Sequence, residues 1–77
     1  MWLAMAILTL EAIGPKAEQL ANDAGEALDI PVGYDPEFEC ATFDSDTQDE
    51  DELQAIVFEA LARIDSEWQA HLRLLAD

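Results

Sequence analysis

The chain has 77 residues, of which 51% are hydrophobic, and its 18 acidic residues against three lysines and arginines give a formal charge of −15. This length predicts a single domain over residues 1–77, and the apolar fraction is that of a folded protein. The charge argues against direct binding to nucleic acid or to an anionic membrane, because both require clusters of basic side chains. It favours a basic partner instead.

Two further features indicate the cellular compartment. Cys40 is the only cysteine, so no disulfide can form within the chain and a reducing cytoplasm is the simplest location. We expect Cys40 to be a small core residue, because it lies in an alternation of apolar and polar residues. The apolar segment 1–10 has no basic start and no small-residue cleavage site, and it is too short to span a bilayer. We therefore expect a cytoplasmic protein whose core includes this segment.

Residues 1–12 are almost entirely apolar, which is typical of a strand covered on both faces. A helix is the alternative, because alanine, leucine and methionine are strong helix formers. The short length and the break at Gly14-Pro15 favour the strand. A helix is then expected to begin with Pro15 at its first position and to continue to about Leu28. Small residues on its apolar side would let it lie close against a sheet.

Residues 30–34 and 38–43 predict two short strands joined by the turn-forming triplet Asp35-Pro36-Glu37. The second strand alternates between two sets of residues, which is the pattern of a strand with one exposed face. One set is Phe38, Cys40 and Thr42, and the other is Glu39, Ala41 and Phe43.

The last segment predicts a long amphipathic helix from about Gln48 to Ala76. Its apolar residues recur every three or four positions: Leu53, Ile56, Val57, Ala60, Leu61, Ile64, Trp68, Leu72 and Leu75. Thr47 and Glu50 have the spacing of a capping box at its start. We expect the helix to pack through Val57, Leu61, Ile64 and Trp68.

This helix would be about 43 Å long, whereas a compact domain of this size is roughly 30 Å across. Either it bends near Asp65-Ser66, or its end pairs with the same helix of a second copy; we prefer the bent monomer to the homodimer. The expected fold is α/β (α+β), in the order strand-helix-strand-strand-helix, with both helices on one face of a short sheet.

The sequence contains little that supports catalysis or cofactor binding. His71 is the only histidine, and the sequence places no nucleophile with an orienting group beside it. A calcium-loop pattern starting at Asp44 fails, because Asp49 stands where glycine is required and Ala55 where a bidentate acid is required. We therefore predict that the protein is not an enzyme and binds no cofactor or dedicated metal ion.

The acids are unevenly distributed along the chain. Nine of the 18 lie within 18 residues that contain no base: Asp35, Glu37, Glu39, Asp44, Asp46, Asp49, Glu50, Asp51 and Glu52. An ordinary solvated surface would intersperse bases among the acids, and adaptation to high salt would spread the acids over the whole surface. The concentration of acids in one segment instead favours a protein that mimics a polyanion and presents its carboxylates to a protein surface that normally binds DNA. We predict these nine residues as the partner-binding site.

In its length, its charge and this acidic segment, the chain resembles the small acidic inhibitors encoded by phages, notably DNA-mimicking anti-CRISPR proteins. The resemblance concerns general character and includes no family motif. It implies an inhibitor that blocks the DNA-binding surface of an effector complex by occupying it. An immunity protein or antitoxin that neutralises a basic nuclease would have the same sequence character, and an acidic housekeeping protein of a halophile remains an alternative.

Overall fold

The central strand of the sheet is the first one in the chain. The computed structural model describes residues 6–46 and 49–74, and β1 (Ala6–Ala12) pairs on one side with β3 (Cys40–Ser45) and on the other with β4 (Leu72–Leu74). The edge strand β2 (Val32–Asp35) pairs with β3, which gives the order β2-β3-β1-β4 with all pairs antiparallel.

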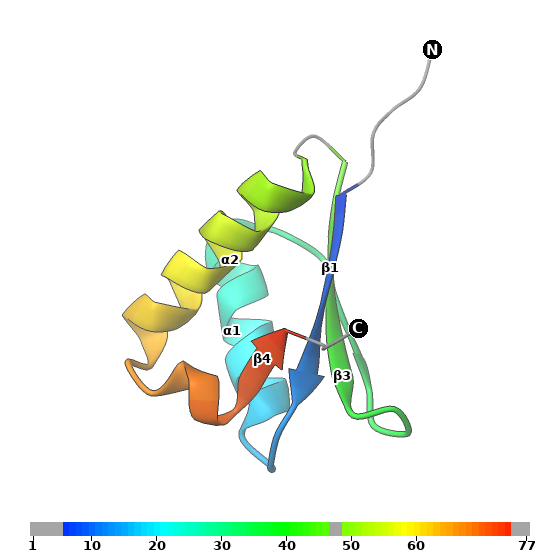
Figure 1. Ribbon diagram of the computed structural model, residues 1–77, viewed down its shortest axis with the longest axis vertical. Coiled ribbons are helices and arrows are strands. Elements are labelled where there is room, and N and C mark those ends of the chain that lie inside the picture. The colour runs from blue at the N-terminus through cyan, green and yellow to red at the C-terminus, as the bar shows by residue number, and fades with distance from the viewer. Residues whose placement is uncertain (1–5, 47–48, 75–77) are drawn as a thin grey trace.

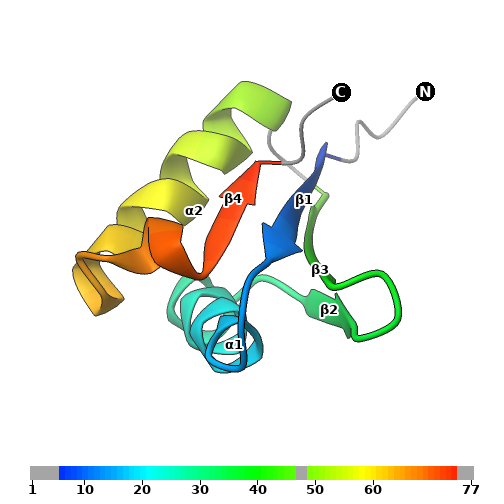
Figure 2. The same ribbon diagram turned by 60° about the horizontal axis from the view of Figure 1, so that its bottom comes forward.

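Two helices connect these strands and cover the same face of the sheet (Figures 1 and 2). They are α1 (Ala17–Leu28) and α2 (Glu50–Ile64), and the short 3-10 helix η1 (Trp68–Ala70) precedes β4. The described elements therefore follow the order βαββαβ, which with this strand order is the ferredoxin-like split βαβ arrangement. The expected α+β sheet with two helices is confirmed, and the closing strand β4 was not predicted.

The sheet has one buried and one open face. Ala6, Leu8, Leu10 and Ala12 of β1 are buried under the helices, whereas Ile7 on the opposite face is 48% exposed. The prediction that the first strand is covered on both faces is therefore wrong, because both helices lie on one side.

On β3 the same alternation buries Ala41 and Phe43. It leaves Cys40 half-buried on the open face, so the expectation that Cys40 is a core residue is also wrong. The pattern identified two faces correctly but did not say which one the helices cover.

Helix α1 lies close to the sheet, as its small residues predict. Its buried residues are Ala17, Leu20, Ala21, Ala24 and Gly25. A Cβ atom at Gly25 would overlap the Val32 side chain and lie 2.9 Å from the Ile30 carbonyl oxygen, so only glycine permits this approach of α1 to β2. The helix begins at Ala17 after Lys16, so Pro15 is in the preceding turn rather than at the first helical position.

The two predicted middle strands exist and are joined by a turn over residues 36–39. The Asp35 carboxylate accepts hydrogen bonds from the backbone N–H groups of Glu37 and Phe38, at 2.9 and 3.3 Å. The Ala12 N–H donates to the Glu39 carbonyl oxygen at 2.7 Å, which anchors the turn to the end of β1.

The last helix is much shorter than predicted. Asp49 is its N-cap and accepts a hydrogen bond from the Glu52 N–H at 2.8 Å; Thr47 and Gln48 of the predicted start lie outside the described residues. The helix ends at Ile64, not at Ala76. The Asp65 carboxylate accepts the Glu67 N–H at 2.9 Å, and this local bond competes with continued helix.

The apolar stripe continues past the end of α2 in other elements. Trp68 is buried from η1, where its ring lies 4.7 Å from that of Phe58, and Leu72 is buried from β4. Ile64 is 42% exposed, contrary to expectation, and Leu75 lies outside the described residues. The alternative in which an extended helix end presents Trp68 and Leu72 to a second copy does not hold, because the helix ends at Ile64 and the domain itself buries both residues.

None of the helices within residues 6–46 and 49–74 is both long and apolar enough to cross a membrane.

Candidate functional site

The successive helices and strands run back and forth between two ends of the domain (Figure 1). One end is formed by the last turn of α1 with residues 29–31, by the end of β3 with Asp46, and by the first turn of α2. We call it the acidic end, because it carries eight acids: Glu26, Asp29, Asp44, Asp46, Asp49, Glu50, Asp51 and Glu52.

The three bases of the chain lie toward the opposite end. Lys16 precedes α1, and Arg63 in the last turn of α2 pairs with Glu59 at 2.7 Å. Arg73 of β4 pairs with Glu11 of β1 at 3.2 Å. His71 lies at this end too, with its Nε2 atom 3.9 Å from Asp65. The fold thus separates charge along the domain, and no base lies at the acidic end.

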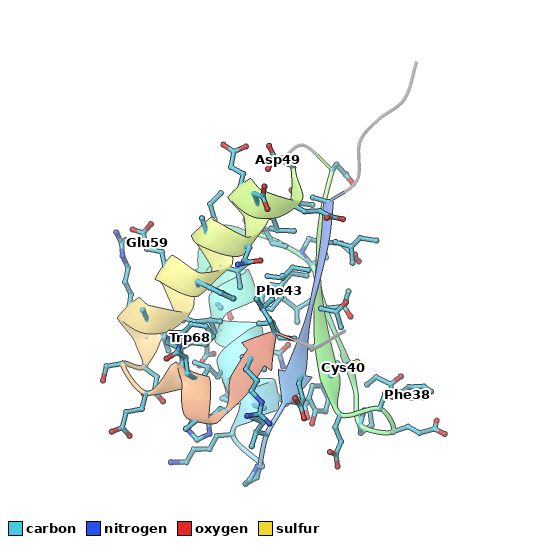
Figure 3. The ribbon with its side chains drawn as sticks, viewed as in Figure 1. Phe38, Cys40, Phe43, Asp49, Glu59 and Trp68 are labelled. Carbon is cyan, nitrogen blue, oxygen red and sulfur yellow. The ribbon has the colours of Figure 1, made fainter. Side chains whose placement is uncertain are left out.

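The nine predicted site residues do not form one surface. Six of them are at the acidic end. The other three lie at the other end of β3: Asp35 as the last residue of β2, and Glu37 and Glu39 in the hairpin turn. Figure 3 shows this separation, with Asp49 at the top of α2 and Phe38 in the distant turn. The six residues of β3 span roughly 20 Å. The nine residues therefore do not lie together, because a strand runs through the middle of the acidic segment, and their role as a partner-binding site stays a prediction.

The acids also differ in what they do within the fold. The carboxylates of Asp35 and Asp49 accept backbone N–H groups and so hold a turn and a helix start. Glu50, Asp51 and Glu52 are exposed in the first turn of α2, where the positive end of the helix dipole stabilises them. Asp44 and Asp46 make no side-chain hydrogen bond or ion pair with any other described residue.

The structure adds Asp29 to the acidic end, which sequence reasoning did not single out. It follows α1 with a left-handed backbone (φ 55°), and its N–H closes the helix on the Glu26 carbonyl oxygen. The Asp44 N–H donates to the Pro31 carbonyl oxygen at 3.2 Å, which fastens the loop after α1 to the end of β3. Asp29 is fifteen positions before Asp44 in the sequence, so no local spacing could have linked them.

A depression of about 440 Å³ lies where these segments meet. Four apolar residues line it: Leu28, Ile30, Pro31 and Ile56. Asp29, Asp44 and Asp46, together with Ser45, complete its lining. The acidic end is thus not a flat charged surface but includes a concave region with apolar walls.

Within the part of the chain that the structure describes, no group of three or more histidine, cysteine, aspartate or glutamate side chains is placed to hold a metal ion. Cys40 lies on the open face of the sheet, and His71 lies in the turn after η1. Between them, Glu11 of β1 is paired with Cys40 on one side and with Arg73 of β4 on the other.

Comparison with protein-family models, with curated proteins and with solved structures found no match to this chain. Its charge and geometry are therefore the basis for assigning a function.

Proposed function

We propose that the protein is an inhibitor that binds a basic, nucleic-acid-binding protein through its acidic end and blocks access of nucleic acid by occupying that surface. The supporting observation is the placement of eight carboxylates at one end of a small domain whose three bases lie elsewhere. Duplex DNA presents one negative charge per about 1.7 Å of axis, and proteins grip it with arrays of lysine and arginine. The acidic end presents charge of the same sign to such an array.

The rigidity of the acidic end supports this proposal. Asp44 belongs to β3 and is paired with Ile7 of the central strand. The acidic first turn of α2 is followed directly by Leu53, which is fully buried in the core. A preorganised array of charges loses less conformational entropy on binding than a disordered acidic tail. The backbone that carries these carboxylates therefore has its place in the fold before the domain meets the partner.

A binding site of this kind has a characteristic dependence on salt. Complementary charges speed up encounter at low ionic strength, and the Debye length falls from about 10 Å at 0.1 M salt to 3 Å at 1 M. Binding should therefore be fast in dilute buffer and should weaken steeply as salt is added.

The test is displacement of DNA from the target. Proteins captured on the immobilised domain from a lysate of the cells that encode it are purified and loaded with a fluorescent DNA duplex. We expect the domain to displace the duplex, which is measured as a fall in fluorescence anisotropy. The triple substitution Asp46→Lys, Glu50→Lys and Asp51→Lys should abolish displacement, with circular dichroism confirming the fold. Asp49 is left unchanged because it caps α2.

The matched control is the triple substitution Glu18→Lys, Asp23→Lys and Glu67→Lys. It changes the net charge equally, and Glu18 lies in the first turn of α1, as Glu50 and Asp51 do in α2. We expect this control to displace DNA nearly as well as the wild type. If both triple variants lose displacement to the same extent, the acidic end is only part of a generally charged surface and the proposal is wrong.

The same experiment separates the remaining alternatives. A basic nuclease among the captured proteins, inhibited by the wild type and not by the first triple variant, would identify an immunity protein or antitoxin that acts through this end. A housekeeping protein adapted to high salt would displace no DNA and would unfold in dilute buffer. The hairpin acids are tested with Glu37→Lys and Glu39→Lys, which should have little effect because the turn lies at the other end of β3.

A further inference from the structure

We infer that the depression at the acidic end is a receptor for one long cationic side chain, arginine or lysine, of the basic partner. This inference rests on the proposed function and specifies how the acidic end engages its partner. It combines the shape of the depression, the chemistry of its walls and the orientation of α1.

The first observation concerns shape and apolar contact. The depression of about 440 Å³ is walled by Leu28 from α1, by Ile30 and Pro31 from the following loop, and by Ile56 from α2. Leu28, Ile30 and Ile56 are only half-buried, so each still exposes part of its side chain. Lysine and arginine bury their aliphatic stems along such surfaces while the charged group stays near water or a carboxylate. An anion or a small polar molecule would leave these walls without a partner.

The second observation concerns the carboxylates. Asp29 and Asp46 are exposed and line the depression, and neither has a side-chain hydrogen bond or ion pair to another described residue. Asp44 also belongs to the lining, at the edge where its strand position directs the side chain to the open face of the sheet. By contrast, Asp35, Asp49 and Asp65 accept backbone N–H groups. Carboxylates without a structural partner are available to accept charge-assisted hydrogen bonds from a guanidinium or ammonium group.

The third observation is the end of α1. Leu28 is the last residue of this helix and Asp29 is its C-cap, so the negative end of the helix dipole lies at the depression. Helices commonly place lysine, arginine or histidine in the last turn to compensate this partial charge. Helix α1 has no base in its last turn and has Glu26 there instead. A cationic side chain of the partner would supply the missing compensation.

The test uses short cationic peptides as probes. Hexa-arginine and hexalysine are titrated into the full chain by isothermal titration calorimetry in dilute buffer, next to hexamers of 2,4-diaminobutyric acid, which have the same charge on a shorter stem. The triple substitution Asp29→Asn, Asp44→Asn and Asp46→Asn removes the lining charges. Asparagine tolerates the left-handed backbone of residue 29. The matched control, Glu18→Gln, Asp23→Asn and Glu67→Gln, removes three charges outside the acidic end.

We expect the first triple variant to bind hexa-arginine about tenfold more weakly than the wild type, because it loses charge-assisted bonds. The control triple should lose less than about threefold, since it removes only longer-range attraction. The short-stemmed hexamer should bind the wild type at least about threefold more weakly than hexalysine, because it contacts less of the apolar wall. In nuclear magnetic resonance spectra, hexa-arginine should shift the amides of Asp29, Ile30 and Ser45 most.

Two results would overturn the inference. Equal weakening of the two triple variants would show that the peptides sense only overall charge, and equal binding of the long and short stems would show that the apolar walls are not used. Either result leaves the proposed function standing if the wild type still displaces DNA from a captured protein. Failure of the wild type to bind any cationic peptide would also overturn the inference, whereas failure to displace DNA from the captured proteins would refute the proposed function itself.

Discussion

At the scale of single residues, Gly25 determines how closely α1 approaches the sheet. Glycine in the middle of a helix costs up to about 1 kcal/mol relative to alanine, so propensity alone predicts that Gly25→Ala stabilises the protein. The structure predicts the opposite, because the added methyl group would overlap Val32 and crowd the Ile30 carbonyl oxygen. We expect Gly25→Ala to lower the free energy of unfolding by about 1–3 kcal/mol, as overpacking does. Urea denaturation measures this value.

A second substitution on α1 serves as the control for Gly25→Ala. Ala27 is exposed, so Ala27→Gly should show the propensity effect alone, a loss of about 1 kcal/mol. A Gly25→Ala variant that is as stable as the wild type, or more so, would mean that α1 does not lie so close to β2.

At the scale of elements, the structure differs most clearly from the predicted continuous helix at the end of α2. Leu61 is fully buried and Ile64, one turn later, is 42% exposed. We expect Leu61→Ala to reduce the free energy of unfolding by about 2–5 kcal/mol, enough to unfold much of so small a domain. Ile64→Ala should cost less, about 1 kcal/mol, because 42% of the residue is already exposed to water. Thermal melts of the two variants measure the difference, and equal losses would mean that the helix packs through both residues.

Sequence periodicity predicted the existence of most elements but not where the last helix stops. Leu61, Ile64, Trp68 and Leu72 keep the helical spacing, yet the last two are buried from η1 and β4. A three-residue strand is too short to show an alternating pattern, and it exists here because β1 offers it an antiparallel partner. The local signal for the break was Asp65-Ser66, because aspartate and serine side chains compete for backbone hydrogen bonds.

The candidate site was predictable in part. The acids from Asp44 to Glu52 are close in sequence and remain close in the fold, because a short connection joins β3 to α2. Strand β3 runs between the two groups of acids, which separates Asp35, Glu37 and Glu39 from the acidic end. Asp29 belongs to the acidic end because of the order of the strands in the sheet. Both depend on tertiary pairing, which composition and spacing do not encode.

At the scale of the whole molecule, the fold confines eight of the 18 acids to one end, so their mutual repulsion opposes folding. Added salt should relieve this repulsion, since the Debye length falls from about 30 Å at 0.01 M to 3 Å at 1 M. We expect the melting temperature to rise by about 4–8 °C over this range, which corresponds to about 1 kcal/mol for a domain of this size. Differential scanning calorimetry in sodium chloride measures the change.

A variant at the acidic end distinguishes charge screening from other effects of salt. Asp46→Asn, Glu50→Gln and Asp51→Asn together should flatten the dependence of melting temperature on salt. If the wild type melts at the same temperature across the range, the carboxylates are too far apart, or too well solvated, for their repulsion to affect stability.

The central position of β1 also has a consequence for the order of folding. The β2–β3 hairpin and the two helices consist of neighbouring residues, so each can form within microseconds by local contacts. Strand β1 has no such option, because its partners β3 and β4 come from the middle and from the far end of the chain. During synthesis β1 emerges before both of its partners, and it stays without its second neighbour until residues 72–74 have left the ribosome. We therefore expect the closing of the sheet by β4 to be a late, loop-closure-limited step that completes the sheet around β1.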